Sequence, residues 1–235
     1  MNERAGEDGD SRKPTALYHD YLTVIYGLLA TEGLIQFSRL LLAHGLSLSS
    51  FLLFLGTFLT SLHFWFACVT VDGVSQPFYT VLTSRNERLR SAFLLIDAVF
   101  AAAFAACLLI MFASLSPESG QPLLVFSGFL WLGVISLVYD LYSWGLVATV
   151  RKFDLNSNDR EAVAYYGTVV RRWVIQDLTF CILAGIVRSG GHRFPVYLNP
   201  FAAGLVAVSV TVLIFDVFVL DDDSSRRSVT SSLRH

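Results

Sequence analysis

The sequence predicts an all-α fold, a polytopic membrane bundle of six transmembrane helices with both termini in the cytoplasm. Its composition favours this class. Charged residues make up 15% of the 235 residues and hydrophobic residues 54%, and the mean hydropathy is +0.57. A soluble domain carries about 25% charged residues, so this chain has too little charge to cover a globular surface. The composition therefore excludes a single soluble core, a disordered chain and a coiled coil.

A second observation is a series of apolar runs, each near the length of about 20 residues that a helix needs to cross a bilayer. The six expected spans are Ala16–Ser38, Leu48–Val71, Ser91–Leu115, Leu123–Trp144, Arg171–Val187 and Phe201–Leu220. They divide the chain into a flexible cytoplasmic tail over residues 1–15, a membrane domain over 16–220 and a second flexible cytoplasmic tail over 221–235.

The spans carry individual signals. The first follows a polar tail that lacks the apolar core and cleavage site of a signal peptide, so we expect it to be retained. The third contains the small-residue run Ala101–Ala106, and the fourth contains Gly128 and Gly133, which permit close helix approach. The fifth is short and begins with Arg171 and Arg172, whose side chains can reach the lipid headgroups.

Aromatic residues mark the expected interfaces, and the sixth span has a small-residue run of its own at Ala202–Ala207. Tyrosine and tryptophan are enriched at both membrane–water interfaces. The aromatic residues near expected span ends are Tyr18, Tyr21, Trp65, Trp144, Trp173 and Tyr197.

The distribution of cations predicts the orientation. With a cytoplasmic N-terminus, fourteen of the 17 lysines and arginines fall on the cytoplasmic side, against Arg39, Arg188 and Arg193 outside. The positive-inside rule therefore favours cytoplasmic termini and an even number of helices. The fourteen are Arg4, Arg12, Lys13, Arg85, Arg88, Arg90, Arg151, Lys152, Arg160, Arg171, Arg172, Arg226, Arg227 and Arg234.

The ionisable residues inside the spans suggest a threefold repeat of helical hairpins. Three aspartates occupy the odd spans, and each is followed in the next span by another ionisable residue. The pairs are Asp20 with His63 after 43 residues, Asp97 with Asp140 after 43, and Asp177 with Asp216 after 39. Chance similarity between apolar runs remains the alternative to a true repeat.

The expected topology places these residues toward the cytoplasmic side, with His63 somewhat deeper. Ionisable groups in a bilayer are costly and usually face the bundle interior or a wet cavity. The functional interpretation is a vestibule for a cation or a proton, in which His63 titrates near neutral pH. The structural alternative for Asp20, Asp97 and Asp177 is helix capping or ion pairing with nearby arginines. Asp140 and Asp216 are more informative, because the C-terminal end of a helix disfavours a carboxylate.

A second polar stripe lies on the first span. Glu32 and Gln36 are four residues apart and share a helix face with Arg39, which follows three residues later. An interaction of Arg39 with Glu32 or Gln36 that joins two helices is the plain interpretation. The alternative is that Glu32 lines an ion path.

The motifs of known enzymes are absent from the sequence. Tyr139-Asp140 matches half of the site of intramembrane aspartyl proteases, but no Gly-x-Gly-Asp surrounds Asp177 or Asp216. HExxH, GxSxG, P-loop and GxGxxG motifs do not occur. The three cysteines lack metal-ligand or disulfide spacing. We therefore expect no enzyme, no cofactor, no metal site and, with a net charge of −2, no nucleic-acid partner.

Residues 58–66, Phe-Leu-Thr-Ser-Leu-His-Phe-Trp-Phe, are similar to the Phe/Trp-bearing second helix of the lysosomal and bacterial six-helix potassium channels. That family also has an aspartate near the start of its first helix. Its Phe-Ser-Asp-Gly motif is not present at His19-Asp20-Tyr21. The resemblance covers less than a fifth of the chain, so neither the filter nor the ion selectivity of that family is carried over.

The sequence thus predicts a homo-oligomeric channel or small transporter in the plasma membrane that uses an acidic cluster to handle a cation or proton. The alternative is a non-conducting sensor or scaffold subunit whose loops and tails recruit a cytoplasmic partner, because these segments carry mixed charge and can also approach anionic lipids.

Overall fold

The computed structural model describes residues 14–44, 47–83, 87–115, 123–193 and 199–214. In this part of the chain the secondary structure is entirely helical. The long helices are α1 (Pro14–His44), α2 (Leu48–Thr83), α3 (Glu87–Ser114), α4 (Leu123–Val150) and α5 (Ser157–Arg193), and a shorter apolar helix covers Asn199–Ile214.

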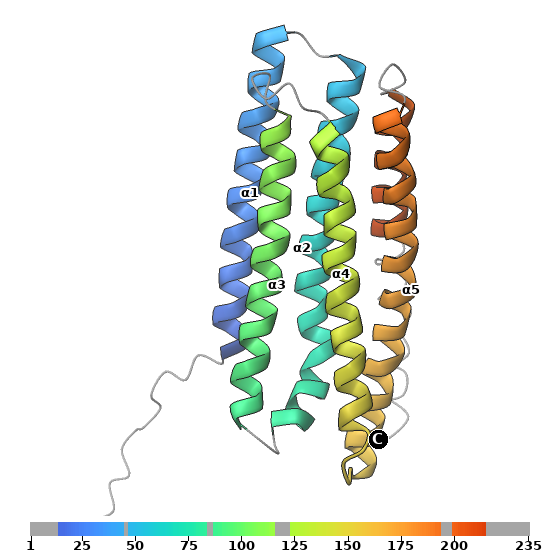
Figure 1. The fold of residues 1–235 in the computed structure, drawn as a ribbon. Coiled ribbons are helices and arrows are strands. Elements are labelled where there is room, and N and C mark those ends of the chain that lie inside the picture. Colours follow the sequence, from blue (N-terminus) through green and yellow to red (C-terminus); the bar gives the residue numbers. More distant parts are fainter. Residues whose placement is uncertain (1–13, 45–46, 84–86, 116–122, 194–198, 215–235) are drawn as a thin grey trace, which may run out of the picture.

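The five long helices run alternately up and down in one elongated bundle (Figure 1). Helix α1 packs on α2 and α3, α3 packs on α4, and α4 makes its most extensive contact with α5. Helix α2 also contacts α5, which brings the second and fifth helices side by side in the interior.

Two helices begin at the residues that the hydropathy pattern predicts. Helix α2 starts at Leu48 because Ser47 caps it: the Ser47 hydroxyl accepts a hydrogen bond of 3.1 Å from the backbone N–H of Ser50. Helix α4 starts at Leu123, also as expected.

At the end of the bundle that holds the α4–α5 turn, α2 and α5 extend beyond the apolar spans expected from the sequence. Helix α2 continues twelve residues past Val71, through an internal Pro77, and α5 begins fourteen residues before Arg171. The start of α5 is set by Asn156, whose side-chain oxygen accepts a 2.8 Å hydrogen bond from the N–H of Asp159. Hydropathy marks membrane-compatible segments, whereas a capped helix continues wherever packing supports it.

Among the residues that the structure describes, four helices contain segments long and apolar enough to cross a membrane, as expected of a membrane protein. These segments are Thr23–Leu42, Leu48–Phe66, Leu95–Ser114 and Leu123–Val150.

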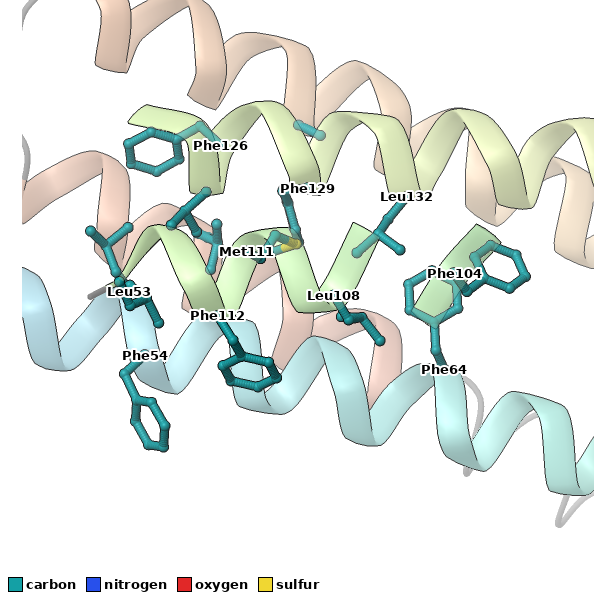
Figure 2. Close-up of a cluster of buried hydrophobic side chains, with 14 of the residues drawn as sticks. Leu53, Phe54, Phe64, Phe104, Leu108, Met111, Phe112, Phe126, Phe129 and Leu132 are labelled. Atoms are coloured by element: carbon teal, nitrogen blue, oxygen red, sulfur yellow. The ribbon is translucent and has the colours of Figure 1, made fainter. Parts of the chain in front are cut away.

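The interior contains two apolar clusters at different levels. The larger one joins α1, α2, α3, α4, α5 and Asn199–Ile214 and includes Phe54, Phe64, Phe104 and Phe129. Figure 2 shows Phe64 of α2 against Phe104 of α3, at a centroid distance of 4.8 Å. The Phe54 ring projects from the other side of α2 and stacks on Phe37 of α1 at 4.2 Å. The smaller cluster lies toward the α4–α5 turn and joins α2, α3, α4 and α5. Its buried members are Phe78, Val81, Leu82, Phe93, Val147, Val150, Leu155, Val163, Tyr166, Val169, Val170 and Val174.

Close helix contacts occur at the small residues of α2 and α4. A Cβ atom at Gly133 would lie 2.6 Å from the Phe180 ring of α5, and one at Gly128 would lie 2.4 Å from Met111 of α3. The expectation that these two glycines allow close helix approach is therefore confirmed. Gly56 of α2 is in similarly close contact with Leu205 of Asn199–Ile214.

Candidate functional site

Asp97 of α3 is the centre of a buried polar network. Its side chain is 7% exposed. The hydroxyl of Tyr79 on α2 donates a 3.2 Å hydrogen bond to Asp97 Oδ2, and the hydroxyl of Tyr139 on α4 donates a 3.1 Å hydrogen bond to Asp97 Oδ1. Both carboxylate oxygens are thus engaged by phenols from two different helices.

Tyr166 of α5 extends the network. Its ring is 2% exposed and lies 4.5 Å from the ring of Phe78 in a stacked arrangement. Its hydroxyl is hydrogen-bonded to Ser143 of α4 and to Tyr79, so hydroxyl groups connect Ser143, through Tyr166 and Tyr79, to the carboxylate of Asp97. Such a chain of hydroxyl groups ending at a carboxylate can hold and pass a proton.

The network combines two negative groups. Tyr166 interacts electrostatically with both Asp97 and Asp140, and the Asp140 side chain on α4 is 4% exposed. Carboxylates on two neighbouring helices therefore act electrostatically on the same phenol. A buried negative charge favours uptake of a proton or a cation.

Tyr79 and Tyr166 stay protonated at neutral pH, because their pKa values are raised. Burial is the main cause that raises the pKa of Tyr79 well above 10.0, and the charges of Tyr166 and Asp97 raise it further. Burial likewise raises the pKa of Tyr166, while its hydrogen bond with Ser143 acts in the opposite direction. Both phenols are therefore available as hydrogen-bond donors.

The position of Asp97 excludes a role as a helix cap. Helix α3 begins at Glu87, ten residues before Asp97, and α5 begins twenty residues before Asp177. Capping side chains lie at the first turn, so the capping alternative does not hold for either aspartate.

The other candidate residues occupy different places. His63 is 5% exposed, and its ring meets Phe64 edge-on at 4.9 Å. It lies sixteen residues before Tyr79, which is about 24 Å along α2. Asp177 is 6% exposed and lies eleven residues, or about 16 Å along α5, from Tyr166. The structure thus places Asp97 and Asp140 where both act electrostatically on Tyr166, and it places Asp177 and His63 farther along their helices.

Two candidates cannot be placed in this network. The side chain of Asp20 and the whole of Asp216 lie outside the described residues, as do most of the two expected tails.

Two members of the polar stripe on α1 interact with each other. The Gln36 side-chain N–H donates a 2.6 Å hydrogen bond to Glu32 Oε1, and Gln36 is 5% exposed. Glu32 is thus held within α1, while the Arg39 side chain is exposed.

Buried hydroxyl groups follow one face of α2. Thr57, Thr60 and Ser61 lie on this face, and Ser75 lies on it one turn before Tyr79. The Thr60 hydroxyl is 2.9 Å from the Ser209 hydroxyl of Asn199–Ile214, which joins two helices by a polar contact. The buried Phe64 of the larger apolar cluster also lies on this face, after Ser61, so the described hydroxyl groups form two separate sets at different levels.

A groove of about 300 Å³ lies between α5 and Asn199–Ile214, away from this network. Its wall is mainly apolar and includes Ile175, Phe180 and Val212, with Gln176 and Thr179 as polar members.

Sequence reasoning missed Ser143 and the inner tyrosines Tyr79 and Tyr166. For the two tyrosines the sequence signals only that the helices continue this far, and it does not mark the side chains as members of the network. Tyr79 is not at a position that the expected repeat marks. It lies beyond Pro77, in a segment with enough apolar residues to continue the helix. The Asn156 to Asp159 spacing is a helix-start signal that places Tyr166 inside α5.

Comparisons with known proteins give no assignment: no protein-family model, no curated protein and no solved structure matches this chain. Within the described ranges, no group of three or more His, Cys, Asp or Glu side chains is arranged to hold a metal ion.

Proposed function

We propose that this chain is a membrane channel or small transporter that moves a proton or a cation along the polar face of α2 and through the Asp97 network. The observation that supports this proposal most directly is that two buried carboxylates, Asp97 and Asp140, both act electrostatically on Tyr166, a buried member of the smaller apolar cluster. Buried ionisable residues at membrane depth are costly and mark ion or proton pathways in many membrane proteins.

The buried hydroxyl groups on this face of α2 lie at two levels, Thr57 to Ser61 and Ser75, which are about 21 Å apart along the helix. Ser61 on this face is 8% exposed, and its hydroxyl oxygen has no hydrogen-bond partner, which leaves it available to a passing water or ion.

The proposal includes six spans with both termini in the cytoplasm. Helix α5 and Asn199–Ile214 would add two crossings to the four apolar segments. The exposed Arg151 and Lys152 in the turn between α4 and α5 support a cytoplasmic location for that end. The Asp97 network would then lie at the cytoplasmic side. The proposal also includes the threefold repeat. The support for the repeat is that Asp97 and Asp177, which occupy corresponding positions on α3 and α5, are both buried.

Self-association in the plasma membrane belongs to the same proposal. Helix α1 exposes Val24, Leu28, Leu34 and Leu42 on its outer surface, which suits either lipid or a second copy.

A non-conducting sensor or scaffold is the second candidate. The observation that favours it is the smaller apolar cluster, which packs α2 on α4 and α5 well beyond the Leu48–Phe66 segment. Beside this end of the bundle, Phe153 is exposed next to Lys152. A cytoplasmic partner could contact this end of the bundle.

Flux measurements on purified protein in liposomes test the proposal. Proton flux is followed with an internal pH-sensitive dye, and sodium and potassium flux with radioactive tracers. We expect Asp97→Asn and Asp140→Asn to lose most of the flux of the wild-type protein. Asp154→Asn is the matched control, because Asp154 is an exposed aspartate in the α4–α5 turn, 3.9 Å from Arg160. Asp216→Asn adds Asp216, the candidate on the sixth expected span, to the series.

The outcomes separate the two candidates. The absence of flux under proton, sodium and potassium gradients would overturn the channel or transporter proposal. If, in addition, removal of residues 221–235 abolished the cellular function, the scaffold candidate would be favoured.

A further inference from the structure

The groove between α5 and Asn199–Ile214 has a buried floor and exposed walls. Its volume is about 300 Å³. Phe180 and Val212 line it and are only 3% and 7% exposed. Other lining residues, Ile175 on α5 and Ala207 on the shorter helix, are exposed. The groove is therefore open to the surroundings of the bundle.

Small side chains on both walls leave this space open. Thr179 lines it from α5, and Ala207 and Thr211 line it from the shorter helix. The Thr179 hydroxyl donates a 2.9 Å hydrogen bond to Ile175 O, and the Thr211 hydroxyl donates a 2.8 Å hydrogen bond to Ala207 O. Both hydroxyls are thus satisfied within their own helices, so these walls suit a hydrocarbon chain.

The outer surface of α5 beside the groove is also apolar. Ile175, Leu178, Ile182 and Ile186 all expose much of their side chains. In water such a surface is unfavourable. In the proposed arrangement of six spans, α5 crosses the bilayer and this surface contacts lipid hydrocarbon.

One face of α5 changes from charged to apolar along the groove. In chain order this face carries Arg172, Gln176, Thr179 and Leu183, at spacings of four, three and four residues. The last three of these residues line the groove. Arg172 lies one turn before them, about 6 Å along the helix from Gln176, and the neighbouring Arg171 is exposed. Two cations therefore lie near one end of an apolar groove.

The charge and the length of this face define the class of ligand. A guanidinium binds phosphate through charge-assisted hydrogen bonds. From Arg172 to Leu183 the face extends over eleven residues, or about 16 Å. This is about half of the 30 Å hydrocarbon core of a bilayer, so the face matches the depth of one leaflet.

We propose that the groove binds one anionic phospholipid of the cytoplasmic leaflet, with its phosphate at Arg171 and Arg172 and an acyl chain between α5 and Asn199–Ile214. This inference rests on the six spans of the proposed function, because it needs α5 in the bilayer. The cytoplasmic leaflet carries anionic lipids. A zwitterionic headgroup brings a positive charge near the two arginines and should bind less well.

Photo-cross-linking in vesicles tests the site. The protein is reconstituted in phosphatidylcholine with a small fraction of a probe, either phosphatidylglycerol or phosphatidylcholine, that carries a diazirine on one acyl chain. Mass spectrometry identifies the labelled residues. The outer surface of α3, which exposes Val99 and Ile110, is the internal reference for lipid that merely surrounds the bundle. Relative to this reference, we expect the anionic probe to label the groove at least about fivefold more strongly than the zwitterionic probe does.

Substitution of the arginines tests the headgroup contact. Arg171→Gln and Arg172→Gln should each lower the preference for the anionic probe by about fivefold, which corresponds to about 1 kcal/mol per basic residue. Labelling of the groove by the zwitterionic probe should not change. Lys152→Gln is the matched control, because Lys152 is an exposed cation in the α4–α5 turn, away from the groove.

Groove-filling variants test the acyl-chain contact. Ala207→Phe and Thr179→Phe place a ring in the groove from opposite walls, so each should reduce labelling of the groove by both probes. Ala106→Phe is the control, because Ala106 is an exposed alanine within the apolar segment of α3. All three positions are exposed, and the midpoint of thermal unfolding in detergent verifies that the variants remain folded.

Labelling does not require transport, so the outcomes separate this site from the proposed function. Equal labelling of the groove by the two probes, or labelling that both filling variants leave unchanged, overturns the lipid site even when flux persists. If the filling variants dissociate an oligomer and leave the labelling unchanged, a second copy occupies the groove and the lipid site is overturned. The expected labelling without any flux would keep the lipid site and overturn the transport proposal.

Discussion

The hydroxyl of Tyr139 lies 3.1 Å from Asp97 Oδ1, although the two residues are 42 positions apart and belong to antiparallel helices. This contact and the one from Tyr79 make Asp97 the point where α2, α3 and α4 are joined by polar groups. A hydrogen bond to a charged group contributes about 1.5–3 kcal/mol to stability.

The first prediction concerns these two hydrogen bonds. Tyr139→Phe and Tyr79→Phe should each lower the free energy of unfolding by about 1.5–3 kcal/mol, because the phenyl ring keeps the packing and loses the donor. Chemical unfolding in detergent, followed by tryptophan fluorescence, measures the change. Tyr21→Phe is the control for an exposed tyrosine.

A double-mutant cycle identifies the partner. In an Asp97→Asn background the cost of Tyr139→Phe should shrink, since a neutral amide is the weaker acceptor. Equal costs in both backgrounds would show that Tyr139 stabilises the bundle through another contact.

The second prediction is a dependence of stability on alkaline pH. Burial raises the pKa of Tyr79 and Tyr166 above the unfolded value of 10.0, so the folded protein holds these phenolic protons more tightly than the unfolded chain does. The contribution of both groups to the free energy of unfolding should be complete below pH 10 and should be lost as the pH rises through their higher folded-state pKa values.

Ultraviolet absorbance of tyrosinate measures this titration directly. Tyr79 and Tyr166 should ionise only when the protein unfolds, whereas most exposed tyrosines ionise near their usual pKa. Tyr166→Phe should reduce the alkaline loss of stability. A Tyr166 that titrates together with exposed tyrosines in the folded protein would contradict its burial.

The third prediction concerns the seam between α2 and Asn199–Ile214. A Cβ atom at Gly56 would collide with the Leu205 side chain, so Gly56→Leu should destabilise the protein by about 1–3 kcal/mol or more through overpacking. Thermal unfolding of purified protein in detergent gives the size of the effect.

The chain offers matched glycine controls for this change. Nothing lies within 4 Å of a Cβ atom at Gly27 or Gly145. Gly27→Ala and Gly145→Ala should therefore be neutral or stabilising by up to about 1 kcal/mol, because alanine favours the helix. If Gly56→Leu were as well tolerated as these two changes, the close approach at Leu205 would be wrong.

The fourth prediction is the orientation of the bundle. Phe153 in the α4–α5 turn and Ser47 before α2 are exposed at opposite ends. In a background with Cys68, Cys107 and Cys181 replaced by alanine, Phe153→Cys should react with an impermeant thiol reagent only after the cells are permeabilised. Ser47→Cys should react in intact cells. The reverse pattern would place the termini outside and the Asp97 network on the outer side.

Much of the helical architecture is predictable from the sequence. The starts of α2 and α4 coincide with the expected boundaries at Leu48 and Leu123, because hydropathy and capping are local properties. The extents of α2 and α5 at the end that holds the α4–α5 turn were underestimated. Pro77 interrupts the pattern of α2, and the charged residues at the start of α5 lower its hydropathy, but packing of Phe78 and Tyr166 carries both helices farther.

The candidate site was predictable only in part. Asp97 and Asp140 stand out in the sequence because ionisable groups in apolar runs are rare. Their partners do not, since tyrosines near span ends are common and match the aromatic belt of any membrane protein. No local signal distinguishes Tyr79 and Tyr139, which donate to Asp97, from Tyr21, which is exposed.

The sequence by itself determined the class of this protein and where several of its helices begin, because composition, apolar run length and capping act within a few residues of the chain. Tertiary structure alone decided that Asp97 and Asp140 approach Tyr166, while His63 lies about 24 Å along α2 from Tyr79. The register between neighbouring helices sets these distances, and it depends on how Gly133, Phe180 and the other interlocking side chains pack across the bundle.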